Sequence, residues 1–200
     1  MQNKFKFLIL CGIFSPLIAY SSIALAILNM PHFSWIRNAL SDLGVWRDSA
    51  NIFNYGLMIS AIIQLLFIFG LGIVYRRILI RIGLIFYAIA TMFLFLIGFY
   101  PESVGRIHFY VSFLFFILTP LSLIVTSTFL IKEYREIKFG IITLLLAFSS
   151  YIPWLFPWKA MNISGIAIPE LLSTIPISIW NIYNSILIIK SWNSIVRFKF

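Results

Sequence analysis

Six apolar runs, each about 20 residues long, constrain the fold of this chain more than any other feature. They cover residues 7–28, 53–75, 82–99, 107–131, 139–158 and 166–189. A helix of about 20 residues spans the ~30 Å hydrocarbon core of a bilayer. Because the runs lack the alternation of a closed barrel, only helices can satisfy their backbone in lipid. We therefore predict an all-α polytopic membrane protein, a single bundle of six transmembrane helices over residues 1–200.

Composition agrees with this prediction. The mean hydropathy is +1.01 and only 10% of the residues are charged, far from the balance of a soluble domain. The first run begins like a signal segment but is longer than a signal core and contains Pro16 and Tyr20, so we expect it to remain as a spanning helix. Cys11 is the single cysteine, which excludes a disulfide within the chain.

The basic residues are distributed unevenly between the two sides of the predicted bundle. With both termini inside, the inner segments carry Lys4, Lys6, Arg76, Arg77, Arg81, Lys132, Arg135, Lys138, Lys190, Arg197 and Lys199. The outer loops carry only Arg37, Arg47, Arg106 and Lys159. This positive-inside bias predicts cytoplasmic N- and C-termini. We therefore attribute the net charge of +9 to the topology of the chain and to attraction to anionic head groups. No nucleic-acid partner is expected, because the predicted bundle offers no soluble surface for a basic binding patch.

Groups suited to acid–base or metal chemistry gather in the predicted outer loops. They are Asp42, Asp48, Glu102, Glu170, His32 and His108. Only Glu133 and Glu136 lie on the inner side, and no charged residue lies in the middle of a span. Ionisable groups near a membrane are costly and often mark a site, so the outer face is the predicted functional face.

The stretch N-A-L-S-D-L-G at residues 38–44 lies in the longest outer loop and predicts a short interfacial helix between the first two spans. Ile36, Leu40 and Leu43 recur at helical spacing and form one apolar stripe. Gly44 is expected to end the turn in a left-handed conformation.

A polar edge of this short helix is expected to face the bundle; it consists of Asn38, Ser41 and Asp42. Asn38 and Asp42 stand one turn apart, and Asn54 in the next span is expected to share their hydrogen bonds. The alternative is structural: the acid caps backbone groups and pairs with Arg37 or Arg47.

His108, at the start of the fourth run, is the best acid–base candidate because imidazole ionises near neutral pH, but it needs a carboxylate within reach. The predicted catalytic residues are Asp42, His108 and Glu102. The predicted substrate-binding residues are Asn38, Ser41, Asn54, Arg37 and Arg106. We predict no cofactor and no metal, because no H-x-x-x-H or C-x-x-C spacing occurs. A metal held by Asp42, Glu102 and His108, with Glu170, stays an open alternative, as does an interfacial histidine satisfied by a carboxylate.

The strings R-N-A-L-S-D-L-G, I-F-N-Y-G-L and G-F-Y-P-E-S-V-G-R-I-H-F together resemble a family of six-helix membrane proteins of archaea and bacteria, domain of unknown function 998. The resemblance covers essentially the whole chain and implies the fold, but no established activity. It also implies the importance of Asn38, Ser41, Asp42, Gly44, Asn54, Pro101, Glu102 and His108. A more distant likeness is to the Frag1/DRAM/Sfk1 group, whose I-S-D-T-G segment lies in the same loop; here Leu43 replaces the Thr and no P-P-E follows. Some members of that group are linked to lipid organisation.

We therefore expect a multi-pass protein of the cell membrane whose outer-facing polar site binds or processes a lipid-like substrate, with membrane lipids as partners. The alternative is a non-enzymatic scaffold or accessory subunit of a membrane complex, in which the same groups only hold the outer loops against the bundle. A small-molecule transporter comes third, since no buried charge marks a path. Whether the chain is an enzyme, and which proteins it contacts, are left open.

Overall fold

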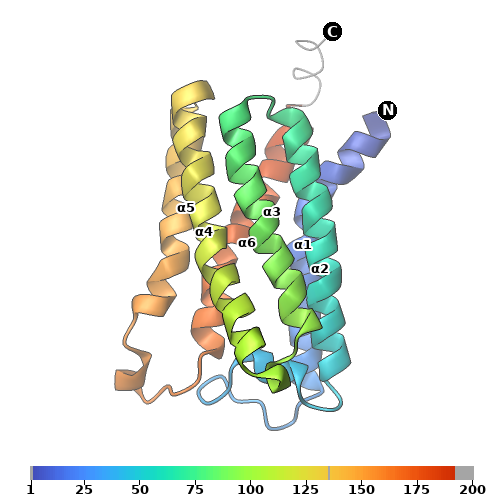
Figure 1. The fold of residues 1–200 in the computed structure, drawn as a ribbon, viewed down its shortest axis with the longest axis vertical. Helices are drawn as coiled ribbons and strands as arrows, with labels where there is room; N and C mark the ends of the chain where they lie inside the picture. The colour runs from blue at the N-terminus through green and yellow to red at the C-terminus, as the bar shows by residue number, and fades with distance from the viewer. Residues whose placement is uncertain (1, 135, 192–200) are drawn as a thin grey trace.

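The computed structural model of the chain describes residues 2–134 and 136–191 (Figure 1). Its long helices are α1 (Gln2–Leu28), α2 (Ala50–Val74), α3 (Ile78–Phe99), α4 (Arg106–Tyr134), α5 (Ile137–Leu155) and α6 (Ala167–Lys190). Within the described residues these six helices are long and apolar enough to cross a membrane, and no strand occurs. The chain is therefore an all-α, multi-pass integral membrane protein, as the apolar runs predict.

The fifth helix shows the clearest departure from the predicted boundaries. Its apolar run extends to residue 158, but α5 ends at Leu155. Phe156 is extended, with ψ 138°, because the ring of Pro157 disfavours a helical conformation in the residue before it. A short 3-10 helix, η3 (Trp158–Met161), follows.

Helices that follow one another in the chain pack side by side, and α6 closes the bundle against α5 and α1 (Figure 1). The start of α1 and the end of α6 lie at the end that also carries the α2–α3 and α4–α5 turns, here called the terminal end. The opposite end, the loop end, carries segments 29–49, 100–105 and 156–166. That the terminal end is cytoplasmic stays a prediction, and three of its basic residues, Arg135, Arg197 and Lys199, lie outside the described residues.

Small residues let neighbouring helices approach closely. Gly56 of α2 faces the side chain of Ser22 on α1, and a Cβ added at Gly98 of α3 would lie 2.5 Å from the backbone oxygen of Asn54 on α2. Gly83 of α3 leaves similarly little room beside Thr126 of α4. Because lipid tails are as apolar as the helices, such close packing is what holds spanning helices together.

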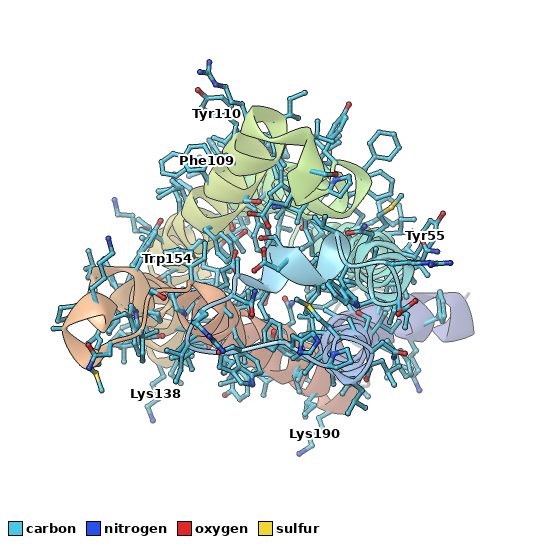
Figure 2. The ribbon with its side chains drawn as sticks, turned by 90° about the horizontal axis from the view of Figure 1, so that it is seen from below. Tyr55, Phe109, Tyr110, Lys138, Trp154 and Lys190 are labelled. Atoms are coloured by element: carbon cyan, nitrogen blue, oxygen red, sulfur yellow. The ribbon has the colours of Figure 1, made fainter. Side chains whose placement is uncertain are left out.

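The loop end is positioned by its own apolar cluster. The short 3-10 helix η1 (Leu40–Gly44) contributes Leu40 and Leu43, which pack with Phe53 of α2 and Phe115 of α4. Aromatic side chains surround this end; Tyr55, Phe109 and Tyr110 point away from the bundle (Figure 2). Exposed aromatic residues favour the membrane–water interface, which agrees with placing η1 at a membrane surface.

Candidate functional site

The predicted short helix forms as η1 and lies across the loop end of the bundle (Figure 2). It contacts α1, α2 and α6, and the 3-10 turn η2 (Glu102–Val104). Leu40 and Leu43 are buried as predicted, whereas Ile36 is 51% exposed. The prediction that Ile36 belongs to the apolar stripe was therefore wrong. Residue 36 lies in a turn before η1 begins, so helical spacing does not apply to it.

Asp42 organises the backbone at the start of η1. Its Oδ2 accepts hydrogen bonds from Asn38 Nδ2 at 2.6 Å and from the Ala39 backbone N–H at 3.0 Å. Asn38 Oδ1 in turn accepts the Ser34 N–H at 2.9 Å. The predicted contact between Asn38 and Asp42 is confirmed, and the acid caps its own turn.

The conformation predicted for Gly44 was wrong. Among the described glycines, the one with a positive φ is Gly105 (φ 72°), so Gly44 is not in the left-handed conformation. Gly44 is needed for space instead, since a Cβ there would lie 2.5 Å from Asn54 Oδ1. Asn54 Nδ2 donates to the Gly44 carbonyl at 2.9 Å, which confirms its predicted link to the turn, while its Oδ1 is buried without a partner among the described residues.

Glu170 joins the start of α6 to η1. It lies in the first turn of α6 and is only 7% exposed. Its Oε2 accepts the Leu40 backbone N–H at 2.6 Å. This bond fixes the first turn of α6 against η1, the helix that also carries Asp42.

The backbone before α6 also pairs with the segment before η1. The N–H groups of Ser164 and Gly165 donate to the Ile36 carbonyl at 2.9 and 2.8 Å, and Ala167 N–H donates to the Asn38 carbonyl at 3.0 Å. Gly165 lies directly against the Asn38 backbone, where no side chain would fit. The two outer loops are therefore fixed to each other.

His108 is 6% exposed and its Nδ1 lies 2.7 Å from the Tyr100 carbonyl oxygen. Because a carbonyl only accepts, Nδ1 carries the hydrogen and Nε2 has no hydrogen-bond partner among the described residues. No hydrogen bond joins the ring to Asp42 or Glu102 within that part of the chain. The direct carboxylate–histidine pair expected from the sequence is thus not made.

His108 and Glu170 instead line one cavity of about 60 Å³, here called the loop-end cavity. Ser41 of η1 and Ser112 of α4 line it too, and the rest of the wall is almost entirely aliphatic and aromatic. Four polar atoms on these lining residues form no hydrogen bond among the described residues, and none of the four is fully buried: Ser41 Oγ, Ser112 Oγ, His108 Nε2 and Glu170 Oε1. The cavity thus combines a carboxylate, an imidazole and two hydroxyls in an apolar shell.

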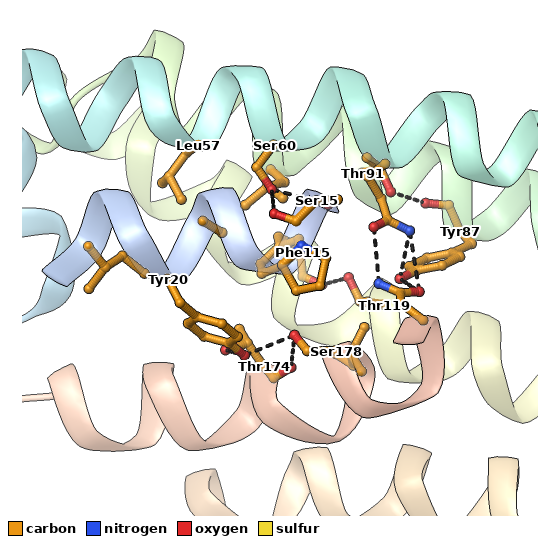
Figure 3. Close-up of a pocket in the computed structure, with 17 residues that line it drawn as sticks. Ser15, Tyr20, Leu57, Ser60, Tyr87, Thr91, Phe115, Thr119, Thr174 and Ser178 are labelled. Atoms are coloured by element: carbon orange, nitrogen blue, oxygen red, sulfur yellow. Dashed lines mark hydrogen bonds between the residues drawn. The ribbon is translucent and has the colours of Figure 1, made fainter. Parts of the chain in front are cut away.

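A second cavity of about 90 Å³, the mid-bundle cavity, lies next to it (Figure 3). The two share wall residues, among them Leu57, Phe115 and Thr174. Figure 3 shows Ser15 beside Ser60, and Tyr20 beside Thr174 and Ser178. No charged side chain lines the mid-bundle cavity.

A closed network of uncharged side chains forms one wall of the mid-bundle cavity. Tyr87 donates to Asn181 Oδ1 at 2.8 Å, and Asn181 Nδ2 donates to Gln64 Oε1 at 3.0 Å. Sequence analysis missed Asn181, although an amide within an apolar run signals a buried partner. It also missed the place of Glu170 in the loop-end cavity, since that residue was considered as a first-turn acid and as a possible metal ligand.

The other predicted site residues do not line either cavity: Asn38, Asp42, Asn54, Glu102, Arg37 and Arg106. Arg37, Arg106 and Glu102 are exposed, and neither Arg37 nor Arg47 forms an ion pair with Asp42 in the described ranges. No group of three His, Cys, Asp or Glu residues able to hold a metal occurs in residues 2–134 and 136–191. Of the predicted set, the structure places Ser41 and His108 together.

The model of one protein family, described as protein of unknown function (DUF998), matches residues 13–184 of the chain. This confirms the family resemblance, whereas the likeness to the Frag1/DRAM/Sfk1 group stays a prediction. No curated protein and no solved structure matches the chain.

Proposed function

Because the chain belongs to the DUF998 family of proteins of unknown function, its activity has to follow from its own residues, and we propose that the loop-end cavity binds the polar end of a lipid-like amphiphile. His108 and Glu170 hold this polar end and are the groups placed to act on it. The amphiphile's apolar part lies among the aliphatic and aromatic side chains between the helices.

The observation that carries the proposal is a cavity that gathers four polar side chains within an otherwise largely apolar wall. Ser41 comes from η1, His108 and Ser112 from α4, and Glu170 from α6, so three separate elements contribute to it. A few convergent polar groups in an apolar cavity are typical of a ligand-binding site. A volume of about 60 Å³ suits a head group of a few atoms, since one water molecule needs about 10–15 Å³.

The chemistry of the wall favours a head group that donates hydrogen bonds. With the hydrogen on Nδ1, an imidazole Nε2 accepts, as does a carboxyl oxygen of Glu170, and the two serine hydroxyls can do either. No lysine or arginine lines the cavity to offset an anion beside Glu170. We therefore expect an alcohol or an amine rather than a phosphate or a carboxylate, and a bound hydroxyl would be placed to lose its proton to His108 Nε2.

Asp42, Asn38 and Asn54 have a positioning role in this proposal. Asp42 holds the first turn of η1, and Asn54 holds its last carbonyl. Together they fix Ser41 and the Leu40 N–H that orients Glu170. Glu102, which is exposed and lines neither cavity, has no role in this proposal.

The variant His108→Asn tests the proposal, because an asparagine amide can still donate to the Tyr100 carbonyl while Nε2 is removed. His32→Asn is the matched control, since His32 is an exposed histidine at the same end. We expect the purified protein to bind oleyl alcohol and oleylamine at least tenfold more tightly than oleic acid, measured by native mass spectrometry. His108→Asn should lose at least tenfold in affinity for the alcohol and His32→Asn should lose none.

Oleic acid binding as tightly as the alcohol would contradict the expected head-group chemistry. Folded His108→Asn protein that binds the alcohol like the unaltered protein would overturn the site itself.

The scaffold alternative is supported by a different observation, the hydrogen bonds that fix the outer loops to each other. In that case His108 and Glu170 only hold the turn between α3 and α4 and the helix η1. The His108→Asn variant, which keeps the bond to the Tyr100 carbonyl, would then melt like the unaltered protein in detergent, and none of the three probes would raise the melting temperature of either protein.

A further inference from the structure

A groove of about 590 Å³ opens between α2 and α3 at the terminal end, the end of the bundle opposite the loop-end cavity. Its walls include Phe69 and Ile73 of α2 and Ile85 of α3, which are 64%, 41% and 58% exposed. Gly72 also lines the groove, and a Cβ added there would meet no atom within 4 Å. The groove is therefore apolar and open along its length.

Two arginines border this groove, Arg76 after the end of α2 and Arg81 in the first turns of α3. Arg81 donates from Nε to the Tyr75 carbonyl at 3.3 Å and from Nη2 to the Gly72 carbonyl at 3.4 Å. These bonds hold the guanidinium beside the groove without neutralising its charge. No aspartate or glutamate lines the groove, so two positive charges meet an apolar surface there.

We propose that this groove binds an anionic phospholipid, with the phosphate between Arg76 and Arg81 and an acyl chain along Phe69, Ile73 and Ile85. Guanidinium groups bind phosphate oxygens through paired, charge-assisted hydrogen bonds. Basic pockets between spanning helices on the cytoplasmic side are suited to anionic head groups, and the charge distribution of the chain predicts that the terminal end is cytoplasmic. Free phosphate would use the arginines but gain nothing from the apolar walls.

The site is independent of the proposed function, because no residue of this groove lines the loop-end or mid-bundle cavity. Its occupancy can therefore be tested whether or not the other site binds an amphiphile.

The double variant Arg76→Gln, Arg81→Gln tests the groove in detergent, with phosphatidylglycerol and phosphatidylcholine of identical acyl chains as probes and native mass spectrometry as the readout. Arg47→Gln, Lys159→Gln is the matched control, because it removes two exposed positive charges from the loop end. We expect the unaltered protein and the control to bind phosphatidylglycerol at least tenfold more tightly than phosphatidylcholine. The double variant should lose this preference.

Gly72→Leu provides a second test that leaves both arginines in place and fills the groove. It should weaken phosphatidylglycerol binding at least fivefold, and millimolar inorganic phosphate should not displace the lipid from the unaltered protein. An unchanged lipid preference in the double variant overturns the proposal. So does full displacement by inorganic phosphate, which would identify a simple anion site.

Discussion

Replacing Glu170 with leucine should destabilise the loop end more than any other change to a predicted outer acid. The substitution removes the acceptor of the Leu40 N–H, a bond of 2.6 Å between segments 130 residues apart. Because the side chain is 7% exposed, water cannot readily replace it. The loss should be about 1–3 kcal/mol, the cost of leaving a buried backbone donor without its acceptor. The melting temperature in detergent, followed by size-exclusion chromatography after heating, measures it.

Glu170→Gln is the matched control, since its amide oxygen can still accept the Leu40 N–H. It should cost about 1 kcal/mol or less, because the hydrogen bond to the Leu40 N–H is kept. In the binding assay it should weaken oleylamine more than oleyl alcohol, because an amine can take the Glu170 proton and form an ion pair, which an alcohol cannot. Equal stability of the leucine variant and the unaltered protein would show that the contact does not hold η1.

Local patterns along the chain predict much of the fold and part of the site. The six spans follow from run length, and the contact between Asn38 and Asp42 follows from their four-residue spacing. Asn54 was linked to the turn because an amide near a helix start needs partners. Each of these inferences needs only residues close together in the sequence or a general requirement of the membrane.

What the sequence could not predict depends on how the helices are rotated about their axes. The start of α6 directs Glu170 at η1, and the start of α4 turns His108 into the same cavity. These two residues are 62 positions apart, and no periodicity relates them. Asp42 and His108 do share one end of the bundle, as predicted, but Asp42 Oδ2 accepts a hydrogen bond from the backbone of its own turn. Shared topology therefore does not bring two side chains into contact.

The second large effect is expected at Gly98, where α3 passes the backbone of α2. A Cβ at this position would lie 2.5 Å from the Asn54 backbone oxygen, and main chain cannot move aside as a flexible side chain can. Gly98→Leu should therefore force the two helices apart and cost about 3 kcal/mol or more, the upper range for overpacking. It should also displace Asn54, whose amide holds the Gly44 carbonyl, and so loosen η1.

Gly72→Leu in the neighbouring helix is the control that separates steric conflict from helix propensity. A Cβ at Gly72 meets nothing within 4 Å, so the same substitution there should be neutral or stabilise the helix by about 1 kcal/mol. Melting temperatures of the two variants in the same detergent decide the matter: Gly98→Leu should melt several degrees below the unaltered protein and Gly72→Leu at or above it. Equal melting temperatures would mean that α2 and α3 do not approach each other at Gly98 as closely as the 2.5 Å contact indicates.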